Sequence, residues 1–187
     1  MKLEPEDAVR ALLKAIGENS AREGLEETPA RYVKALREWT SGYGQDPAKI
    51  LKVFEDGSEN YDQMVLVKDI PVYSLCEHHM APFWGVAHVA YIPNGKIVGL
   101  SKLARLVNIF ARRLQVQERL TQQVAQALQN HLEPRGVGVI LRCRHMCMES
   151  RGVRTPGSET VTSALFGELF DAGKARAEFL GLAGNSM

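Results

Sequence analysis

The 187-residue sequence contains little of three things that often decide a protein's class: cysteine, long apolar runs and net charge. Its three cysteines are an odd number, and two of them lie beside histidines, so a disulfide framework is not expected. Metal binding in a reducing compartment fits this usage better. The apolar runs are much too short to cross a bilayer, and the first residues contain no apolar core of a signal peptide. We therefore expect a cytoplasmic protein with no membrane partner.

The formal net charge is only +1, so the chain as a whole has no electric field that would attract nucleic acid. Nucleic acid is therefore not an expected partner, and any anionic ligand must be held by a local group of cations. Hydrophobic residues make up 45% of the chain and charged residues 24%, which is typical of a globular domain. The length allows one domain with a sizeable core and an additional segment.

The first third of the chain has a helical pattern. Apolar residues recur at helical spacing over 5–16, and Thr28-Pro29 begins a second helix because proline suits the first helical turn. Asp46-Pro47 begins a short third helix, and residues 56–58 form a loop. No obvious chemistry lies in this stretch, so we expect a segment that packs or takes part in oligomer formation.

Strand patterns begin near residue 64, where Val, Ile and Tyr become frequent. Asn94-Gly95 predicts a turn, after which residues 96–98 extend the sheet as a hairpin. The third strand alternates with period two, so Cys143, His145 and Cys147 share one face of it. The segments predicted as strands are 64–75, 83–92, 137–147 and 158–165.

Two apolar stripes at helical spacing separate the second strand from the third and predict helices over 101–114 and 116–132. A further helix over 168–180 follows the last strand. Strands close together along the chain pair antiparallel, and the two intervening helices cover one face of the sheet. The predicted class is α+β, with an N-terminal helical arm over 1–60 and a catalytic domain over 61–187.

The residues with the clearest chemistry are two short runs, Cys76-Glu77-His78-His79 and His145-Met146-Cys147. Cys76 and His79 have the C-x-x-H spacing of two ligands of one zinc ion, and Cys147 is a candidate third ligand. Two sulfurs and one nitrogen would leave a tetrahedral position open, as in catalytic zinc sites. A structural zinc with a fourth protein ligand, or buried thiols without a metal, remain alternatives.

Cys143 is a weaker candidate for the metal than Cys147. The two cysteines are about 13 Å apart along an extended strand, at about 3.3 Å per residue, so one ion would not bind both. We expect Cys143 to be a small buried side chain.

His78 and His145 are candidates for proton transfer beside the metal. An imidazole exchanges protons near neutral pH, and a zinc-dependent hydrolysis needs such a group. The alternative for both is a histidine that supports the site or the core. His88, within a strand, and His131, near a helix end, are expected to be structural.

Basic residues and one glutamate offer binding groups for an anion and a base. Arg151 follows the second run in a loop, where a phosphate near the metal would need donors. Lys102 and Arg105 begin a helix, whose free N–H groups also favour anions. Glu118 is either a first-turn glutamate that favours the helix dipole or a carboxylate that accepts the N1 and N2 protons of guanine. The residues alone do not choose between these.

Taken together, these segments resemble the GTP cyclohydrolase I family over nearly the whole chain. Five motifs occur in the family's order, and a stretch of the arm and the tail fit as well. The matching segments are Thr28-Pro29-Ala30-Arg31, Cys76-Glu77-His78-His79, Gly99-Leu100-Ser101-Lys102-Leu103-Ala104-Arg105, Gln115-Val116-Gln117-Glu118-Arg119-Leu120-Thr121, His145-Met146-Cys147, Arg151-Gly152-Val153 and Ser158-Glu159-Thr160-Val161-Thr162.

The resemblance implies that Cys76, His79 and Cys147 bind one zinc ion per subunit. Zinc-activated water would attack C8 of the guanine ring of GTP, with His145 as proton donor and His78 as an acid and base in later steps. The products would be formate and 7,8-dihydroneopterin triphosphate, at the first step of tetrahydrofolate and pterin biosynthesis. The implied substrate-binding residues are Glu118 for guanine and Ser101, Lys102, Arg105, Arg151 and Arg31 for the triphosphate.

The resemblance also implies the tunnelling fold, in which a four-stranded antiparallel sheet carries two helices on one face, and a homodecamer with its sites at subunit interfaces. Shared sites would explain how a chain of net charge +1 holds a triphosphate. Another purine or pterin enzyme of this fold is one alternative, although such relatives need not keep both His78-His79 and the downstream His-x-Cys. A non-enzymatic zinc-binding module is the other, and it would need a fourth protein ligand and a basic face.

Overall fold

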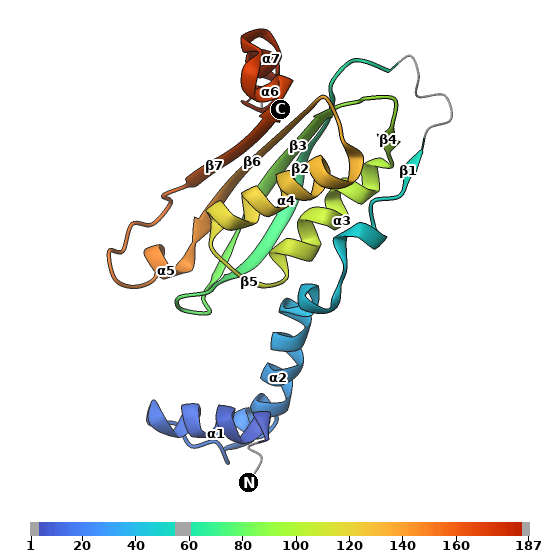
Figure 1. The fold of residues 1–187 in the computed structure, drawn as a ribbon. Coiled ribbons are helices and arrows are strands. Elements are labelled where there is room, and N and C mark those ends of the chain that lie inside the picture. Colours follow the sequence, from blue (N-terminus) through green and yellow to red (C-terminus); the bar gives the residue numbers. More distant parts are fainter. Residues whose placement is uncertain (1–3, 55–60, 185–187) are drawn as a thin grey trace. The chain divides into compact units, whose positions relative to one another are not determined.

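The computed structural model describes residues 4–54 and 61–184, so the loop expected over 56–58 lies outside the described residues (Figure 1). The chain divides into two compact units, Met1–Ser41 and Gly42–Met187. The proposed division at residue 60 into an arm and a catalytic domain stays a prediction. In the described part of the chain, no helix is both long enough and apolar enough to cross a membrane.

The smaller unit contains two helices, α1 (Pro5–Ala15) and α2 (Thr28–Trp39), with a 3₁₀ turn over Glu23–Leu25 between them. Each helix has a proline in its first turn, where the missing N–H has no partner to lose. Val9 of α1 and Val33 of α2 are buried. Both helices agree with the spacing of apolar residues in the sequence.

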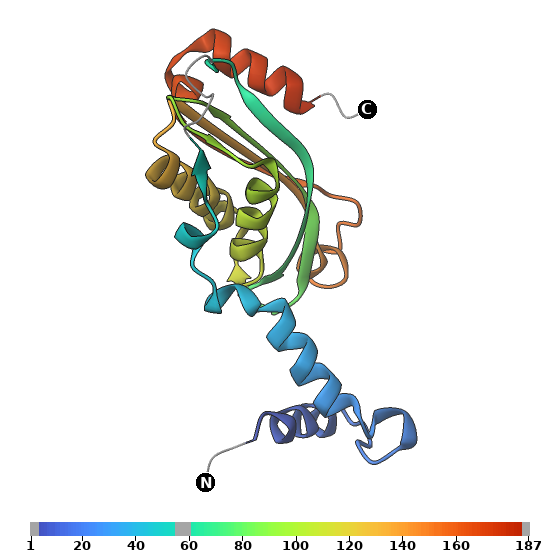
Figure 2. The same cartoon turned by 90° about the vertical axis from the view of Figure 1, so that its right-hand side faces the viewer.

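The larger unit is built on a five-stranded sheet with the order β5-β2-β3-β6-β7. The four long strands are antiparallel neighbours, and the two-residue strand β5 pairs parallel with the end of β2. Helices α3 (Leu100–Ala111) and α4 (Gln117–Leu132) lie on one face of this sheet (Figure 1, Figure 2). The predicted α+β class is confirmed. The strands are β2 (Val65–Cys76), β3 (Pro82–Ile92), β5 (Leu114–Gln115), β6 (Gly136–His145) and β7 (Thr160–Gly167).

The main core lies between the sheet and helices α3 and α4. Each helix turns its apolar stripe toward the sheet, as the helical spacing in the sequence predicts. Burying one Leu, Val or Phe side chain contributes about 1.5–3 kcal/mol, so the stripes together hold both helices against the strands. The buried stripe residues are Leu103, Leu106, Val107 and Phe110 of α3 and Leu120, Val124, Leu128 and Leu132 of α4.

A second, smaller core lies on the opposite face of the sheet. There α6 (Glu168–Asp171) and α7 (Gly173–Gly184) contribute Leu169 and Phe179, which pack on side chains of β3 and β6 that point away from α3 and α4. Gly138 of β6 permits this approach, because a Cβ there would lie 2.8 Å from the Phe179 ring.

Residues 96–98 do not extend the main sheet, contrary to the prediction. β4 (Ile97–Val98) pairs instead with β1 (Val53–Phe54) in a separate two-stranded sheet. The chain bends at Gly95, and the Val98 N–H donates to the Tyr91 hydroxyl at 3.2 Å rather than to a strand of the main sheet. The predicted third helix is only a 3₁₀ turn over Pro47–Lys49, after which the chain extends into β1.

The third strand ends at His145, earlier than predicted. Cys147 lies in a four-residue helix, α5 (Met146–Glu149), so it does not continue the face that His145 ends. The predicted final helix over 168–180 is two helices, because the backbone is extended at Ala172 between them.

His88 has the structural place that the sequence predicts. Its side chain is buried on β3, and its Nδ1 accepts the N–H of Asp69 at 3.3 Å. Asp69 lies at a bulge of β2 and has a φ of +54°, so this contact supports an unusual backbone conformation. Burial lowers the pKa of the His88 imidazole, which favours the neutral ring that accepts this bond. His131 lies exposed in the last turn of α4.

Candidate metal centre and active site

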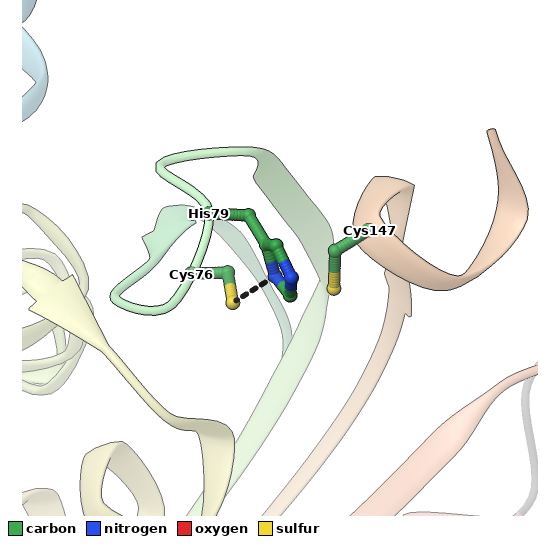
Figure 3. A group of neighbouring side chains, drawn as sticks. All are labelled: Cys76, His79 and Cys147. Atoms are coloured by element: carbon green, nitrogen blue, oxygen red, sulfur yellow. Dashed lines mark hydrogen bonds between the residues drawn. The ribbon is translucent and has the colours of Figure 1, made fainter. Parts of the chain in front are cut away.

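Two thiols and one imidazole converge where the turn between β2 and β3 meets α5 (Figure 3). Cys76 is the last residue of β2, His79 lies in the turn, and Cys147 lies in α5. Their candidate ligand atoms all lie within 4.8 Å of one another, and Cys76 Sγ is 3.7 Å from His79 Nδ1. Zinc binds sulfur at about 2.3 Å and nitrogen at about 2.0–2.1 Å, so the three side chains can reach a single ion.

The pairing of β3 with β6 brings these distant parts of the chain together. Phe83, at the start of β3, lies opposite His145, the last residue of β6. The preceding turn is closed by the Met80 N–H, which donates to the Cys76 carbonyl at 2.7 Å, and Met80 adopts a φ of +52°. The C-x-x-H spacing therefore lies on a tight turn, which brings the Cys76 and His79 side chains together.

The thiols of Cys143 and Cys147 differ in their surroundings. Cys143 is 1% exposed in the main core, and burial raises its pKa to about 12, so the prediction of a small buried side chain is confirmed. Cys147 is partly exposed, and burial together with the nearby Cys76 raises the pKa of its thiol. Among the described residues, the group close enough to share an ion consists of one histidine and two cysteines. That set leaves room for a fourth, non-protein ligand.

His78 lies beside this group without belonging to it. Its Nδ1 is 3.8 Å from Cys76 Sγ, and its Nε2 is 4.0 Å from a carboxylate oxygen of Glu77. The side chain is 64% exposed, so the ring can reach both solvent and a ligand at the metal.

His145 is held more firmly than His78. Its ring stacks on Phe83 with centroids 4.6 Å apart and planes 10° from parallel, and its Nε2 is 2.8 Å from the side-chain oxygen of Gln117. Burial lowers the pKa of the His145 imidazole, and the charge of Glu118 partly opposes this effect. Glu118 lies in the first turn of α4, so the start of this helix faces His145.

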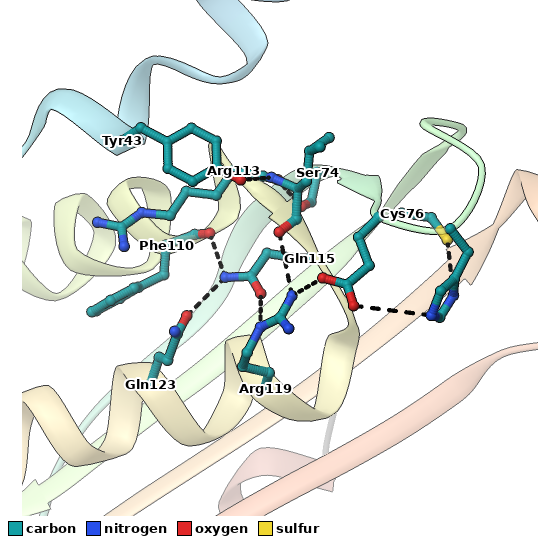
Figure 4. A network of polar contacts seen from close by, with 11 residues as sticks. Tyr43, Ser74, Cys76, Phe110, Arg113, Gln115, Arg119 and Gln123 are labelled. Carbon is teal, nitrogen blue, oxygen red and sulfur yellow. Dashed lines mark hydrogen bonds and ion pairs between the residues drawn. The ribbon is translucent and has the colours of Figure 1, made fainter.

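Glu77, for which the sequence suggested no role, forms an ion pair with Arg119 of α4, and Figure 4 shows Arg119 beside Gln115. Arg119 also donates from Nε to the Gln115 side chain at 3.0 Å, and the Glu77 N–H donates to the Gln115 carbonyl at 2.9 Å. The guanidinium lowers the pKa of the Glu77 carboxyl, so the pair is charged at neutral pH. Cys76 and His79 lie on what we call the metal-binding turn, because both are candidate metal ligands. These contacts tie that turn to β5 and to the first turns of α4.

An open cavity of about 390 Å³ lies over this ion pair. Arg113 stacks over Tyr43 at one side, with 5.9 Å from its guanidinium carbon to the ring centroid. Several polar groups of the wall bond to one another, and Glu77 joins the cavity to the turn that carries His79. Its lining consists of Tyr43, Glu77, Arg113, Leu114, Gln115, Arg119 and Gln123.

Arg151, a predicted phosphate ligand, contacts the metal group, which consists of the candidate ligands Cys76, His79 and Cys147. Its Nη1 lies 3.0 Å from His79 Nε2. Glu149 does not compete for it, because that carboxylate pairs with Arg144 at 2.8 Å and accepts the Gly157 N–H at 3.2 Å. The Arg151 guanidinium therefore lies at the edge of the candidate metal centre.

The other predicted phosphate ligands lie elsewhere. Ser101, Lys102 and Arg105 are in the first turns of α3, which starts after β4 and runs toward β5, whose Leu114 pairs with the end of β2 (Figure 1). At about 1.5 Å per residue, these residues lie about 9–15 Å before the C-terminal end of α3, the end that approaches β5 and the metal group of the same chain. Arg31 belongs to the smaller unit, where it pairs with Glu27.

The sequence did not single out Gln117 as a functional residue. It is 1% exposed, and its amide contacts His145, β6 and β7 at once. A glutamine is common in the first turn of a helix, and the strands that contact Gln117 are distant from it in the sequence. Only its place beside Glu118 in a family motif could have drawn attention to it.

The fold and this group define a class of protein. Two thiols and one imidazole converge at one end of the main sheet, His78 lies beside them, and His145 precedes Cys147 by two residues. These three side chains could hold a single metal ion and would leave a position for an exogenous ligand, as in single-metal enzymes.

Comparison with known proteins identifies the family. A profile of the GTP cyclohydrolase I family matches residues 5–184, so this chain belongs to that family of enzymes. It is 65% identical over 174 residues to GTP cyclohydrolase 1 of Janthinobacterium sp. (strain Marseille), covering 93% of this chain and 88% of that one. For GTP cyclohydrolase 1 of Nitrosospira multiformis the identity is 64% over 172 residues, with 92% and 90% covered. For that of Chlorobaculum tepidum it is 59% over 181 residues, with 96% and 80% covered.

Proposed function

We propose that this protein converts GTP and water to 7,8-dihydroneopterin triphosphate and formate, the first step toward tetrahydrofolate and pterins, with one zinc ion per subunit. The observation that carries the proposal is the convergence of Cys76, His79 and Cys147 in a chain of the GTP cyclohydrolase I family. Two sulfurs and one nitrogen suit zinc and leave one tetrahedral position free. Zinc bound there would supply a water activated for attack on C8 at neutral pH.

Two histidines would move the protons. We assign the proton donor to the imidazole part of guanine to His145, because its ring is held between Phe83 and Gln117 and is half-buried. A fixed ring suits a transfer that needs one geometry. His78 is exposed and free to reorient, which suits an acid and base in the later ring-opening and ring-closing steps.

Glu118 would anchor the guanine. A carboxylate can accept two parallel N–H bonds, which the N1 and N2 groups of guanine offer. Its charge acts on His145, so a base held by Glu118 would lie within reach of that histidine. The same residue also favours the α4 dipole, and the two roles are compatible.

Arg151, Ser101, Lys102, Arg105 and Arg31 would bind the triphosphate. Because Ser101, Lys102 and Arg105 lie about 9–15 Å back along α3 from the end that approaches the metal group of their own chain, the proposal requires that neighbouring subunits supply them. This supports the tunnelling fold assembled as a homodecamer with sites at its interfaces. The free thiols of the metal group suit a cytoplasmic, reducing compartment.

The direct test is to incubate the zinc-loaded protein with GTP and to measure formate and, after oxidation, the fluorescent pterin. We expect both products in equal amounts from GTP and neither from ATP, which lacks the N1 proton and the 2-amino group that Glu118 would bind. Failure to release either product from GTP would contradict the proposal. Formate from another purine nucleotide at a higher rate would favour a different purine enzyme of the same fold.

A further inference from the structure

Gln117 is a buried polar side chain to which the proposed reaction gives no role. Its amide nitrogen lies 2.9 Å from the Thr160 carbonyl and 3.1 Å from the Leu141 carbonyl. A carbonyl oxygen can only accept a hydrogen bond, so the atom that faces these two must be the NH₂ group. The orientation of the amide therefore follows from β6 and β7, and the side-chain oxygen points the other way.

Two threonines remove the remaining ambiguity. The Thr121 hydroxyl is 2.7 Å from the backbone carbonyl oxygen of Gln117 and must donate to it. Thr121 Oγ1 is then the acceptor for the Thr162 hydroxyl at 2.6 Å, so Thr162 donates there. Thr162 Oγ1 is left as a third acceptor for the Gln117 NH₂ group, at 3.1 Å. Each donor in this buried network has an acceptor with the amide in this orientation.

The orientation of Gln117 determines which nitrogen of His145 carries a proton. The Gln117 side-chain oxygen is 2.8 Å from His145 Nε2, and this oxygen can only accept. Nε2 must therefore carry the hydrogen, and the lone pair of the neutral ring is on Nδ1. The other tautomer would put two lone pairs 2.8 Å apart.

We propose that Gln117 is a positioning residue that holds His145 as its Nε2–H tautomer and so makes Nδ1 the atom through which this histidine exchanges protons with substrate. The stack on Phe83 fixes the plane of the ring, and the Gln117 contact fixes its rotation within that plane. The ring can then gain or lose a proton at Nδ1 without breaking its bond to the protein. The role in turnover rests on the proposed function, whereas the tautomer does not.

The tautomer can be measured without any activity. Zinc-loaded protein labelled with ¹³C and ¹⁵N in histidine is examined by solid-state NMR at a pH of about 8.5, above the ordinary imidazole pKa of about 6.5. The signals of His145 are assigned by their loss in His145→Ala. We expect a pyrrole-type Nε2 and a pyridine-type Nδ1. A pyridine-type Nε2, or two tautomers in comparable amounts, would overturn the proposal.

Variants of Gln117 test whether the contact sets the tautomer. Gln117→Met keeps the length of the side chain and removes the acceptor, so we expect mixed tautomers of His145, a kcat for GTP about 10- to 100-fold lower, and little change in KM or zinc content. Gln117→Glu keeps an oxygen that can accept the Nε2 proton, and should retain the wild-type tautomer and more of kcat than Gln117→Met. The matched control is Gln126→Met on the exposed side of α4, whose amide donates to Asn130 at 2.8 Å.

The outcomes separate the two proposals. Wild-type tautomer and kcat in Gln117→Met would overturn the positioning role, and so would equal losses of kcat in the Met and Glu variants. If Gln117→Met does not fold, the tautomer of the wild-type protein and the kcat of Gln117→Glu decide instead. A wild-type protein with the expected tautomer that releases no formate from GTP would refute the proposed function while the assignment of the His145 proton stands.

Discussion

The two ends of helix α3 differ in how much of the proposed active site a single chain supplies near them. Near its C-terminal end, the turn after β2, α5 and the start of α4 bring the metal group, two histidines and Glu118 together. In its N-terminal half, Ser101, Lys102 and Arg105 lie about 9–15 Å back along the helix from that chemistry. A single chain therefore holds the groups that react, but not all of the cations that would hold a triphosphate.

This difference predicts that metal binding and substrate binding respond differently to mutation and to assembly. Zinc binding should depend on residues of one chain, whereas turnover of GTP should depend on residues from neighbouring chains.

Cys147→Ser should remove both zinc and activity. Serine is a poor zinc ligand at neutral pH, so one of the three bonds to the ion is lost, and we expect activity to fall by about a thousandfold or more. Zinc content is measured by elemental analysis after dialysis and activity by formate release. Cys143→Ala is the matched control, because Cys143 is buried in the core away from the group and should keep its zinc. Full zinc occupancy in Cys147→Ser would show that Cys147 is not a ligand.

Arg105→Ala and His145→Ala should complement each other in mixed oligomers. We expect Arg105→Ala to keep zinc and to raise KM for GTP by about 30-fold or more, and His145→Ala to keep zinc and to lower kcat by about 100-fold or more. When the two chains are co-expressed with different tags and purified as mixed assemblies, up to about a quarter of the wild-type activity should return.

The control for this experiment pairs two variants from the same end, His78→Ala and His145→Ala. Both residues lie beside the metal group of one chain, so mixed assemblies of these two should not recover activity. Recovery in the control, or none with Arg105→Ala, would contradict the division of the site between chains.

Arg119→Ala should weaken zinc binding by about tenfold, although Arg119 is not a ligand. Its ion pair with Glu77 ties the metal-binding turn to α4, and residues that hold metal ligands in place typically contribute this much. Zinc affinity is measured by competition with a chelator. Arg135→Ala breaks a similar pair with Glu168 away from the metal and serves as control. An unchanged zinc affinity in Arg119→Ala would mean that the turn keeps its shape without this pair.

Glu168→Gln should have the smallest effect, a lowering of Tm by about 1–2 °C at neutral pH. Arg135 holds the pKa of the Glu168 carboxyl below its ordinary value, through bonds of 2.8 and 3.0 Å. A depressed folded-state pKa stabilises the protein above the unfolded pKa of about 4.3 and loses this contribution as the pH falls through the folded value. The Tm difference from wild type should therefore vanish in acid. Glu178→Gln, at an exposed position of α7, should show no such pH dependence.

The parts of the site that depend on nearby residues were visible in the sequence. Cys76 and His79 are neighbours on one turn, so their spacing alone suggested a shared ion, and the order of strands and helices predicted the class of the fold. The stripes of α3 and α4 are buried as their periodicity predicts, because each faces one large apolar surface.

The parts of the fold and of the site that depend on contacts between distant segments could not be predicted from the sequence. The alternating pattern continues to Cys147, whereas the strand ends at His145 and α5 begins at Met146. Nothing in the local sequence marks this change. The pairing of β4 with β1 required a partner far back in the chain. The contact of Gln117 with His145 depends on the placement of β6 and β7 around the start of α4.

The pairing of Phe83 with His145 also has a consequence for the fidelity of folding. A slip of one residue between β3 and β6 would turn Val139 and Leu141 out of the main core, and it would also carry His145 and α5 away from the turn that holds Cys76 and His79. A register shift that misaligns the active site would therefore also disrupt the hydrophobic core. Stably folded molecules should therefore have a correctly aligned site. The hydrophobic contacts that stabilise the fold thus also disfavour misfolded, inactive molecules.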